Sequence, residues 1–252
     1  AVCNGNIIFP AYEDAVRIAH RAGFGSSLVA APPVDVVQAF EGNKNGKFGT
    51  YPWMKKNGME DLTIRTYAPS RTQFNNSQVQ YPVIVKPFNG GGGRNVYVAR
   101  NGRDLSKIRK HMRHERIIIE EAIENKNEWA LHFSAYRGKM TSTICIRFQF
   151  SHPFGIRKTK TTDAVNTTRI RICPSTILSA TDAIINKSLY HGVGCLSGKF
   201  KADQFKIVDI NPRVCNMAAK YDRDGTFMKT FLELIRKEPK AAETPNCSAS
   251  RH

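Results

Sequence analysis

Short β-branched apolar runs, separated by polar and glycine-rich segments, recur along the chain and predict an architecture rich in strands. The clearest run is residues 83–85, Val-Ile-Val, which ends at Lys86 and Pro87 and predicts a buried strand. A second run, residues 96–98, follows a loop of four glycines. This stretch therefore predicts a strand, a glycine-rich loop and another strand.

The glycine-rich loop is a candidate anion site. Glycine has no Cβ and reaches positive φ freely, so backbone N–H groups can approach a phosphate and form an anion-binding concavity. Lys86 can add a point charge on the same phosphates. A flexible hairpin turn is the alternative interpretation. The loop matches neither G-x-x-x-x-G-K-[ST] nor a helix-opening G-x-G-x-x-G, which disfavours a P-loop and a Rossmann dinucleotide site.

Polar, glycine and proline positions divide the rest of the chain into further elements. The predicted strands are residues 6–10, 27–31, 62–67, 116–122, 128–136, 141–150, 200–202 and 205–210. The predicted helices are residues 12–22, 35–40, 48–57, 105–114, 176–189 and 226–235. Residues 151–172 are polar, basic and rich in Thr, and predict a mobile segment, while residues from 237 onwards predict a frayed tail.

The strand predicted at residues 128–136 alternates in polarity. Its apolar face carries Trp129, Leu131, Phe133 and Ala135. His132 falls on the opposite face. A lone histidine in a strand is more often packed or solvated than a ligand, so we expect a structural position for it.

Composition indicates a globular protein. The 252 residues allow one large domain or two small ones, and a hydrophobic content of 41% is enough for a buried core. No run reaches the roughly 18 apolar residues of a membrane span, and the first residues lack the pattern of a signal peptide. The six cysteines are scattered without C-x-x-C, which argues against a zinc site and for a reduced, cytoplasmic protein with inert thiols.

The formal net charge of +17 is the unusual property of the composition. It favours anionic partners: a nucleotide, another polyanion or nucleic acid. Basic residues are spread along the chain except for a cluster at residues 103–116, whose charge is expected to be a solvated helix face. Since no RNA-binding signature or zinc finger is present, small anionic ligands are preferred and nucleic acid is the weaker option.

The second informative stretch is residues 205–213, FKIVDINPR. A strand here carries Asp209 and Asn211 on one face, and both oxygen ligands could reach a hard cation such as Mg²⁺. Arg213 shares that face and could contact a phosphate. The alternative is an edge strand with solvated polar groups, which the apolar neighbours Ile207 and Ile210 disfavour.

The ordered set VIVKP–GGGGR, IIIEEAI, the strand that begins at Glu128 and KIVDINPR resembles the ATP-grasp superfamily, in its carboxylate–amine ligase and carbamoyl-phosphate-synthase-like branch. The resemblance implies an α+β ATP-grasp fold in which two α/β lobes clasp MgATP. It implies a truncated N-terminal pre-grasp unit at residues 1–40, lobes at 41–122 and 123–240, and a flexible tail at 241–252.

The resemblance also assigns nucleotide-binding residues. These are Lys47, Lys86, Gly90, Gly91, Gly92, Gly93, Arg94, Glu120, Glu121, Ala122, Ile123 and Glu128. The two lysines would contact phosphates and the glycine loop with Arg94 would be a lid over them. The segment from Glu120 to Ile123 would be the hinge that faces the adenine through its backbone, and Glu128 would meet the ribose.

On the metal and substrate side, the resemblance assigns Asp209 and Asn211 to Mg²⁺, and Arg147 and Arg213 to the reacting phosphoryl and carboxylate groups. The sequence departs from the family pattern in four ways. After Pro212 and Arg213, the usual glycines are replaced by Val214, Cys215 and Asn216. Gly46 stands where many members have Asp, Asp209 stands where Glu is commoner, and the preceding strand has Ser197 and basic residues where an acidic metal ligand is usual.

The implied activity is an ATP- and Mg²⁺-dependent, ADP-forming ligase. It would activate a small-molecule or peptide carboxylate as an acyl phosphate for attack by an amine. Two alternatives remain open: a kinase-like phosphotransferase on the same fold, and a basic module that has lost catalysis and binds nucleic acid or another polyanion. No membrane partner is expected, and the sequence does not predict the oligomeric state.

Overall fold

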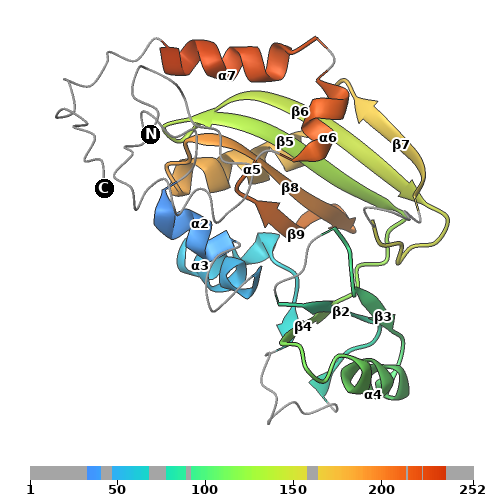
Figure 1. The fold of residues 1–252 in the computed structure, drawn as a ribbon. Helices are drawn as coiled ribbons and strands as arrows, with labels where there is room; N and C mark the ends of the chain where they lie inside the picture. The colour runs from blue at the N-terminus through green and yellow to red at the C-terminus, as the bar shows by residue number, and fades with distance from the viewer. Residues whose placement is uncertain are drawn as a thin grey trace, which may run out of the picture.

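Two β-sheets, each flanked by helices, form the protein (Figure 1). The computed structural model describes residues 33–40, 47–67, 78–88, 92–157, 164–213, 215–222 and 224–236. The elements predicted at residues 6–10, 12–22 and 27–31, most of the pre-grasp unit and the C-terminal tail lie outside the described residues. No helix within the described ranges is long and apolar enough to cross a membrane.

The small sheet contains the strands on both sides of the glycine loop. Its strands are β1 (Thr66–Tyr67), β2 (Val83–Pro87), β3 (Tyr97–Ala99) and β4 (Ile117–Glu121), in the order β1-β4-β2-β3. All neighbours are antiparallel, and β2 pairs along its whole length with β4. Helix α4 (Gly102–His111) packs beneath it (Figure 1), and its fully buried Leu105 belongs to the same core cluster as Val83 and Val85. The basic residues of α4 consequently face solvent.

The large sheet has five antiparallel strands in the order β7-β6-β5-β8-β9. They are β5 (Asn127–Tyr136), β6 (Lys139–Phe150), β7 (Ala164–Ile170), β8 (Gly192–Lys201) and β9 (Gln204–Asn211). Arg137 and Gly138 form the β5–β6 turn with φ of 47° and 78°. This two-residue hairpin turn sets the pairing of Tyr136 with Lys139, and a β-bulge between Ser134 and Ala135 then shifts the register so that Trp129 lies opposite Arg147.

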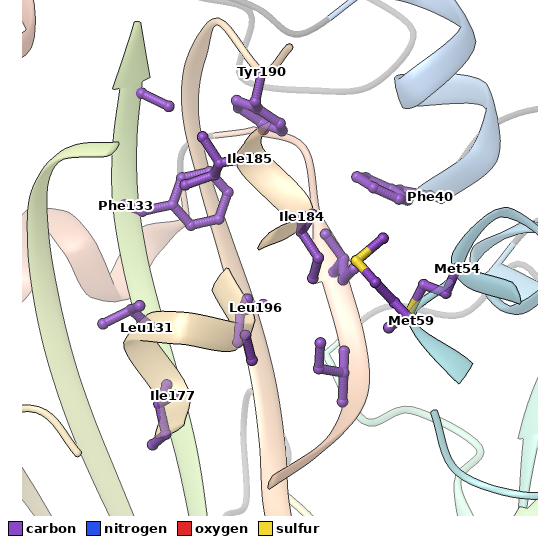
Figure 2. Close-up of a cluster of buried hydrophobic side chains, with 14 of the residues drawn as sticks. Phe40, Met54, Met59, Leu131, Phe133, Ile177, Ile184, Ile185, Tyr190 and Leu196 are labelled. Carbon is purple, nitrogen blue, oxygen red and sulfur yellow. The ribbon is translucent and has the colours of Figure 1, made fainter. Parts of the chain in front are cut away.

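One face of the large sheet packs against α2 (Val34–Phe40), α3 (Thr50–Lys56) and α5 (Ser175–Lys187). Figure 2 shows this core: Phe133 beside Tyr190, with Phe40 and Met54 reaching in from the first two helices. The other face is covered by α6 (Asn216–Tyr221) and α7 (Thr226–Arg236). The lobe boundary predicted at residue 122 separates the two sheets, whereas α3, from the first predicted lobe, shares the core of the second.

Most predicted elements are confirmed, but four differ. Of the strand predicted at residues 62–67, only Thr66 and Tyr67 form a strand, and Glu60–Leu62 is a short 3₁₀ helix. Residues 151–172, predicted to be mobile, contain the edge strand β7, whose polar side chains tolerate solvent at an edge. Strand β8 begins at Gly192, eight residues before the predicted strand, and α6 was not predicted. The start of β8 was not predicted because it contains glycines, which are unfavourable in strands, but packing requires them. A Cβ at Gly194 would lie 2.5 Å from the Tyr190 hydroxyl, and a Cβ at Gly198 would lie 2.4 Å from the Lys206 carbonyl oxygen.

The expectation of reduced, inert thiols is wrong for two of the cysteines. Cys195 and Cys215 form a disulfide, which joins β8 to the start of α6. Cys145 and Cys173 are free thiols. Sequence spacing gave no sign of the disulfide, because the fold brings together two cysteines that lie 20 residues apart.

The core of the large sheet should carry much of the stability. Ile184 is fully buried in it (Figure 2), so Ile184→Ala should lower the free energy of unfolding by about 2–5 kcal/mol through lost burial and a residual cavity. Ile172 is 87% exposed, so the matched Ile172→Ala should change it by less than about 0.5 kcal/mol. Urea unfolding of both variants measures the difference, and equal losses would contradict this assignment of the core.

Candidate functional site

A cavity of about 180 Å³ lies between the two sheets. Strands β2 and β4 of the small sheet and β8 and β9 of the large sheet contribute to its wall, together with the segment 154–157. It brings together many of the predicted site residues: Lys47, Lys86, Gly92, Gly93, Arg94, Glu120, Glu121, Ile123, Glu128 and Asp209. The wall is thus both charged and apolar, with Ile64, Val96 and Phe154 among its apolar members.

Lys47 and Asp209 form an ion pair in this cavity. The Lys47 Nζ lies 2.5 Å from the Asp209 Oδ1, although the residues are 162 positions apart. Lys47 precedes α3, and its backbone N–H donates to the Phe88 carbonyl at 3.3 Å. Burial raises the pKa of Asp209, but the charges of Lys47 and Lys86 and hydrogen bonds from Lys47 and Asn211 outweigh burial and lower the pKa to about 2. Asp209 is therefore ionised at neutral pH.

Lys86 connects the two sheets. Its Nζ lies 2.6 Å from the Glu120 Oε1 on β4 and donates to the Val208 carbonyl on β9 at 3.1 Å. The Tyr51 hydroxyl, from α3, also donates to Glu120. Burial and the Glu120 charge raise the pKa of Tyr51, which keeps its hydroxyl protonated as a donor. Glu120 thus holds Lys86 by its side chain, a role that differs from the predicted backbone contact with adenine.

A second charged group lies across the cavity. The Glu128 Oε1 is 3.5 Å from the Arg157 Nε, and both residues line the wall. Lys199 donates from its Nζ to the carbonyls of Asn125, Pro153 and Gly155. Burial lowers the pKa of Lys199, and Glu128 opposes that shift. These contacts fix the loop that carries Phe154 and Arg157 against the sheet.

The predicted hinge at the end of β4 only partly faces the cavity. Ile123 and Glu121 line it, and the Glu121 carboxylate accepts a hydrogen bond from Lys201. Ala122 is not part of the wall, and its N–H donates to the Pro82 carbonyl at 3.1 Å, so this N–H is used within the fold. Ile123 is left as the hinge residue best placed to contact a base.

The glycine loop meets the cavity through its last two glycines. Gly92 and Gly93 have φ of 62° and 68°, a region that residues with a Cβ rarely adopt, and both line the wall with Arg94. Gly90 and Gly91 lie outside the described residues.

Asp209, Asn211 and Arg213 form a chain of contacts along the end of β9. The Asn211 Nδ2 donates to the Asp209 Oδ2 at 3.0 Å, and the Arg213 guanidinium donates to the Asn211 Oδ1 at 3.1 Å. Asp209 alone of the three lines the cavity, and Ser197 lies opposite it on β8. An ionised carboxylate suits Mg²⁺, which completes its shell with water and phosphate oxygens, so the donor chemistry fits one such ion at Asp209.

Arg147 does not reach this cavity. It pairs directly opposite Trp129, which shares the sheet face covered by α5, whereas Glu128 lies on the other face. Its guanidinium lies 6.0 Å from the centre of the Trp129 ring. The predicted contact with a phosphoryl group therefore has no geometric basis, because a strand alternates its side chains between faces.

Several wall residues lie outside the predicted site set: Phe154, Arg157, Ser197 and Lys199. Tyr51, which was not predicted either, is not part of the wall but donates to Glu120. The sequence did contain a signal for Tyr51, because this residue follows Lys47 by one helical turn. Arg157 and Lys199 had none, because each reaches the cavity through strand pairing and loop contacts far from any motif.

Comparison with known proteins gives a consistent result. The family model described as the ATP-grasp domain matches residues 45–216. No curated protein sequence matches significantly.

Solved structures share the fold at low sequence identity. A biotin carboxylase–βγ-ATP complex from Campylobacter jejuni is 16% identical, with a TM-score of 0.67 over 94% of this chain and 56% of that one. D-alanine–D-alanine ligase from Bacillus anthracis is 15% identical (TM-score 0.62, 88% and 76%). L-amino acid ligase from Bacillus licheniformis is 14% identical (TM-score 0.63, 92% and 55%).

This chain thus spans little more than half of the biotin carboxylase. At these identities the structures show a common fold, and the family match covers most of the chain, including Lys47, the glycine loop and β9. The motifs predicted the same relationship. The chain belongs to the ATP-grasp family.

Proposed function

We propose that this chain binds MgATP in the cavity between its sheets and activates a substrate carboxylate as an acyl phosphate. The carboxylate oxygen takes the γ-phosphoryl group and ADP leaves. An amine then attacks the acyl carbon, expels phosphate and forms a C–N bond. The family match and the presence of two ligases among the structures that share the fold support this class of reaction.

The observation that carries the proposal is the meeting of Lys47, Lys86 and Asp209 in one enclosed cavity beside Gly92 and Gly93. Two ammonium groups and backbone N–H groups favour a polyphosphate, and the carboxylate favours the cation that accompanies it. The apolar wall formed by Ile64, Ile123 and other residues suits a planar base.

Each residue has a definable role. Lys86 is fixed by Glu120 and the Val208 carbonyl, so little reorganisation is needed when it contacts a phosphate. Asp209 would hold Mg²⁺, which when bound neutralises phosphate charge, and Asn211 holds the carboxylate in position. Arg213, next along this chain of contacts, is suited to bind the substrate carboxylate through its planar guanidinium.

The direct test is release of phosphate from MgATP in a screen of amino acids and peptides, with and without an amine acceptor. A ligase requires both substrates for sustained turnover. Turnover with a single phosphoryl acceptor and no amine would instead indicate a phosphotransferase.

Loss of either lysine should weaken nucleotide binding. Lys47→Ala and Lys86→Ala each remove a charge-assisted phosphate contact, worth about 1.5–3 kcal/mol, or roughly 10- to 100-fold in affinity. Lys229→Ala, on the exposed surface of α7, is the control and should bind normally. Calorimetric titration with a non-hydrolysable ATP analogue and Mg²⁺ measures the effect. Wild-type affinity in both cavity variants would rule out the nucleotide site.

Asp209→Asn should abolish turnover and leave the fold intact. The amide keeps the shape of the carboxylate but loses the charge that Mg²⁺ and Lys47 require. Phosphate release at saturating Mg²⁺ and ATP is the measurement, with circular dichroism as the check on folding. A folded variant with wild-type activity would remove Asp209 from the metal site.

Arg213 and Arg147 form a matched pair. Arg213→Ala should lower kcat/KM for the carboxylate by about tenfold or more, with little change in ATP affinity, because it removes a charged hydrogen bond to the substrate. Arg147→Ala, on the other sheet face, should retain near wild-type kinetics. A large loss of kcat/KM in Arg147→Ala, with near wild-type kinetics in Arg213→Ala, would reverse the roles assigned to the two residues.

A further inference from the structure

His132 is a buried polar side chain that the fold does not satisfy. It is 2% exposed, and neither Nδ1 nor Nε2 has a hydrogen-bond partner among the described residues. Buried polar groups are nearly always paired, so an exception requires a physical reason. Burial, with a smaller effect of the Arg157 charge, lowers the pKa of His132 to about 4. The imidazole is therefore neutral at pH 7 and has a lone pair to donate.

Two cysteines lie beside this imidazole. Cys195 is directly opposite His132 on the neighbouring strand β8, and Cys215 immediately precedes α6. A ring nitrogen of His132 and the two Sγ atoms all lie within 4.8 Å of one another. Within the described parts of the chain, this is the only group of three or more such side chains close enough to share an ion.

The three side chains are close enough to share one ion once the disulfide is opened. Zinc binds sulfur at about 2.3 Å and imidazole nitrogen at about 2.0–2.1 Å, so two ligands of one ion lie at most roughly 4.6 Å apart. Small side-chain rotations would meet that limit here. One imidazole and two thiolates are a known ligand combination for zinc, and neutral imidazole is the form that binds.

We propose that reduction of the Cys195–Cys215 disulfide converts His132, Cys195 and Cys215 into a site for one zinc-type cation. A thiol reductant gives two electrons and two protons to the disulfide, which yields two cysteine thiols and the oxidised reductant. Binding of the cation then releases the two thiol protons. Because both states use the same sulfur atoms, the disulfide and the bound cation exclude each other.

The site lies outside the nucleotide cavity, since none of its three residues lines that wall. It is nevertheless close to the predicted substrate end, because Cys195 pairs with Asn211 and Cys215 follows Arg213 by two residues. A bound cation would join β8 to the start of α6, as the disulfide does. The inference does not depend on the proposed ligase activity.

The test begins with the whole chain in two redox states. One sample is kept oxidised, and the other is reduced with a phosphine without oxygen and freed of excess reductant. Both are titrated with Co²⁺, whose thiolate charge-transfer absorption reports sulfur ligands, and then with Zn²⁺ against a competing chelator. We expect equimolar binding and the absorption band for the reduced chain and neither for the oxidised chain. Equal binding by both, or by neither, would overturn the proposal.

Variants identify the ligands. Cys215→Ser and His132→Leu should each weaken Zn²⁺ binding by at least about tenfold, and Cys215→Ser should reduce the sulfur band. Cys173→Ser removes a thiol outside the cluster and is the matched control, with binding expected to match the wild type. Circular dichroism checks the fold of each. Retained affinity in Cys215→Ser or His132→Leu, or a loss confined to Cys173→Ser, would contradict the assigned ligands.

Discussion

The site depends on two half-buried lysines, Lys86 and Lys47, whose side chains contact β9 from outside the large sheet. Lys86 on β2 reaches both Glu120 on β4 and a carbonyl on β9, and Lys47 reaches Asp209 on β9. A charge buried without a partner costs several kcal/mol, so the Lys86–Glu120 pair within the small sheet and the Lys47–Asp209 pair at β9 both favour the arrangement that forms the cavity. The same charged contacts therefore contribute both to the electrostatics of the cavity and to the arrangement of the two lobes.

The hydrophobic core supplies the frame for these pairs. Helix α3 packs its Met54 into the core of the large sheet (Figure 2). The same helix follows Lys47 and carries Tyr51, whose hydroxyl donates to Glu120. Residues from an early part of the chain thus lie beside β9, which comes some 150 residues later. A polyphosphate with its cation would share the charges of Lys47, Lys86 and Asp209, so the side chains that form these ion pairs are also those that would bind substrate.

The sequence was most informative about features that depend on residues close together in the chain. The strands around the glycine loop and the Asp209–Asn211 spacing are short-range patterns, and the structure places Lys86, Gly92 and Asp209 in one wall as expected. Properties set by long-range pairing were not predictable. The β5–β6 register places Arg147 on the face of the large sheet that lies away from the cavity. Loop contacts bring Lys199 to the site. The strands that join His132 to two cysteines depend equally on pairing.

Hydrogen exchange of the whole chain with and without MgATP tests the central claim most directly. Amides that form the cavity wall on the small sheet, residues 84–88, 92–96 and 118–123, should exchange more slowly when nucleotide is bound, because phosphate and base contacts restrict their opening. Amides of α7, on the covered outer face of the large sheet, should not change. Identical exchange of the three wall segments with and without MgATP would contradict a nucleotide site between the sheets.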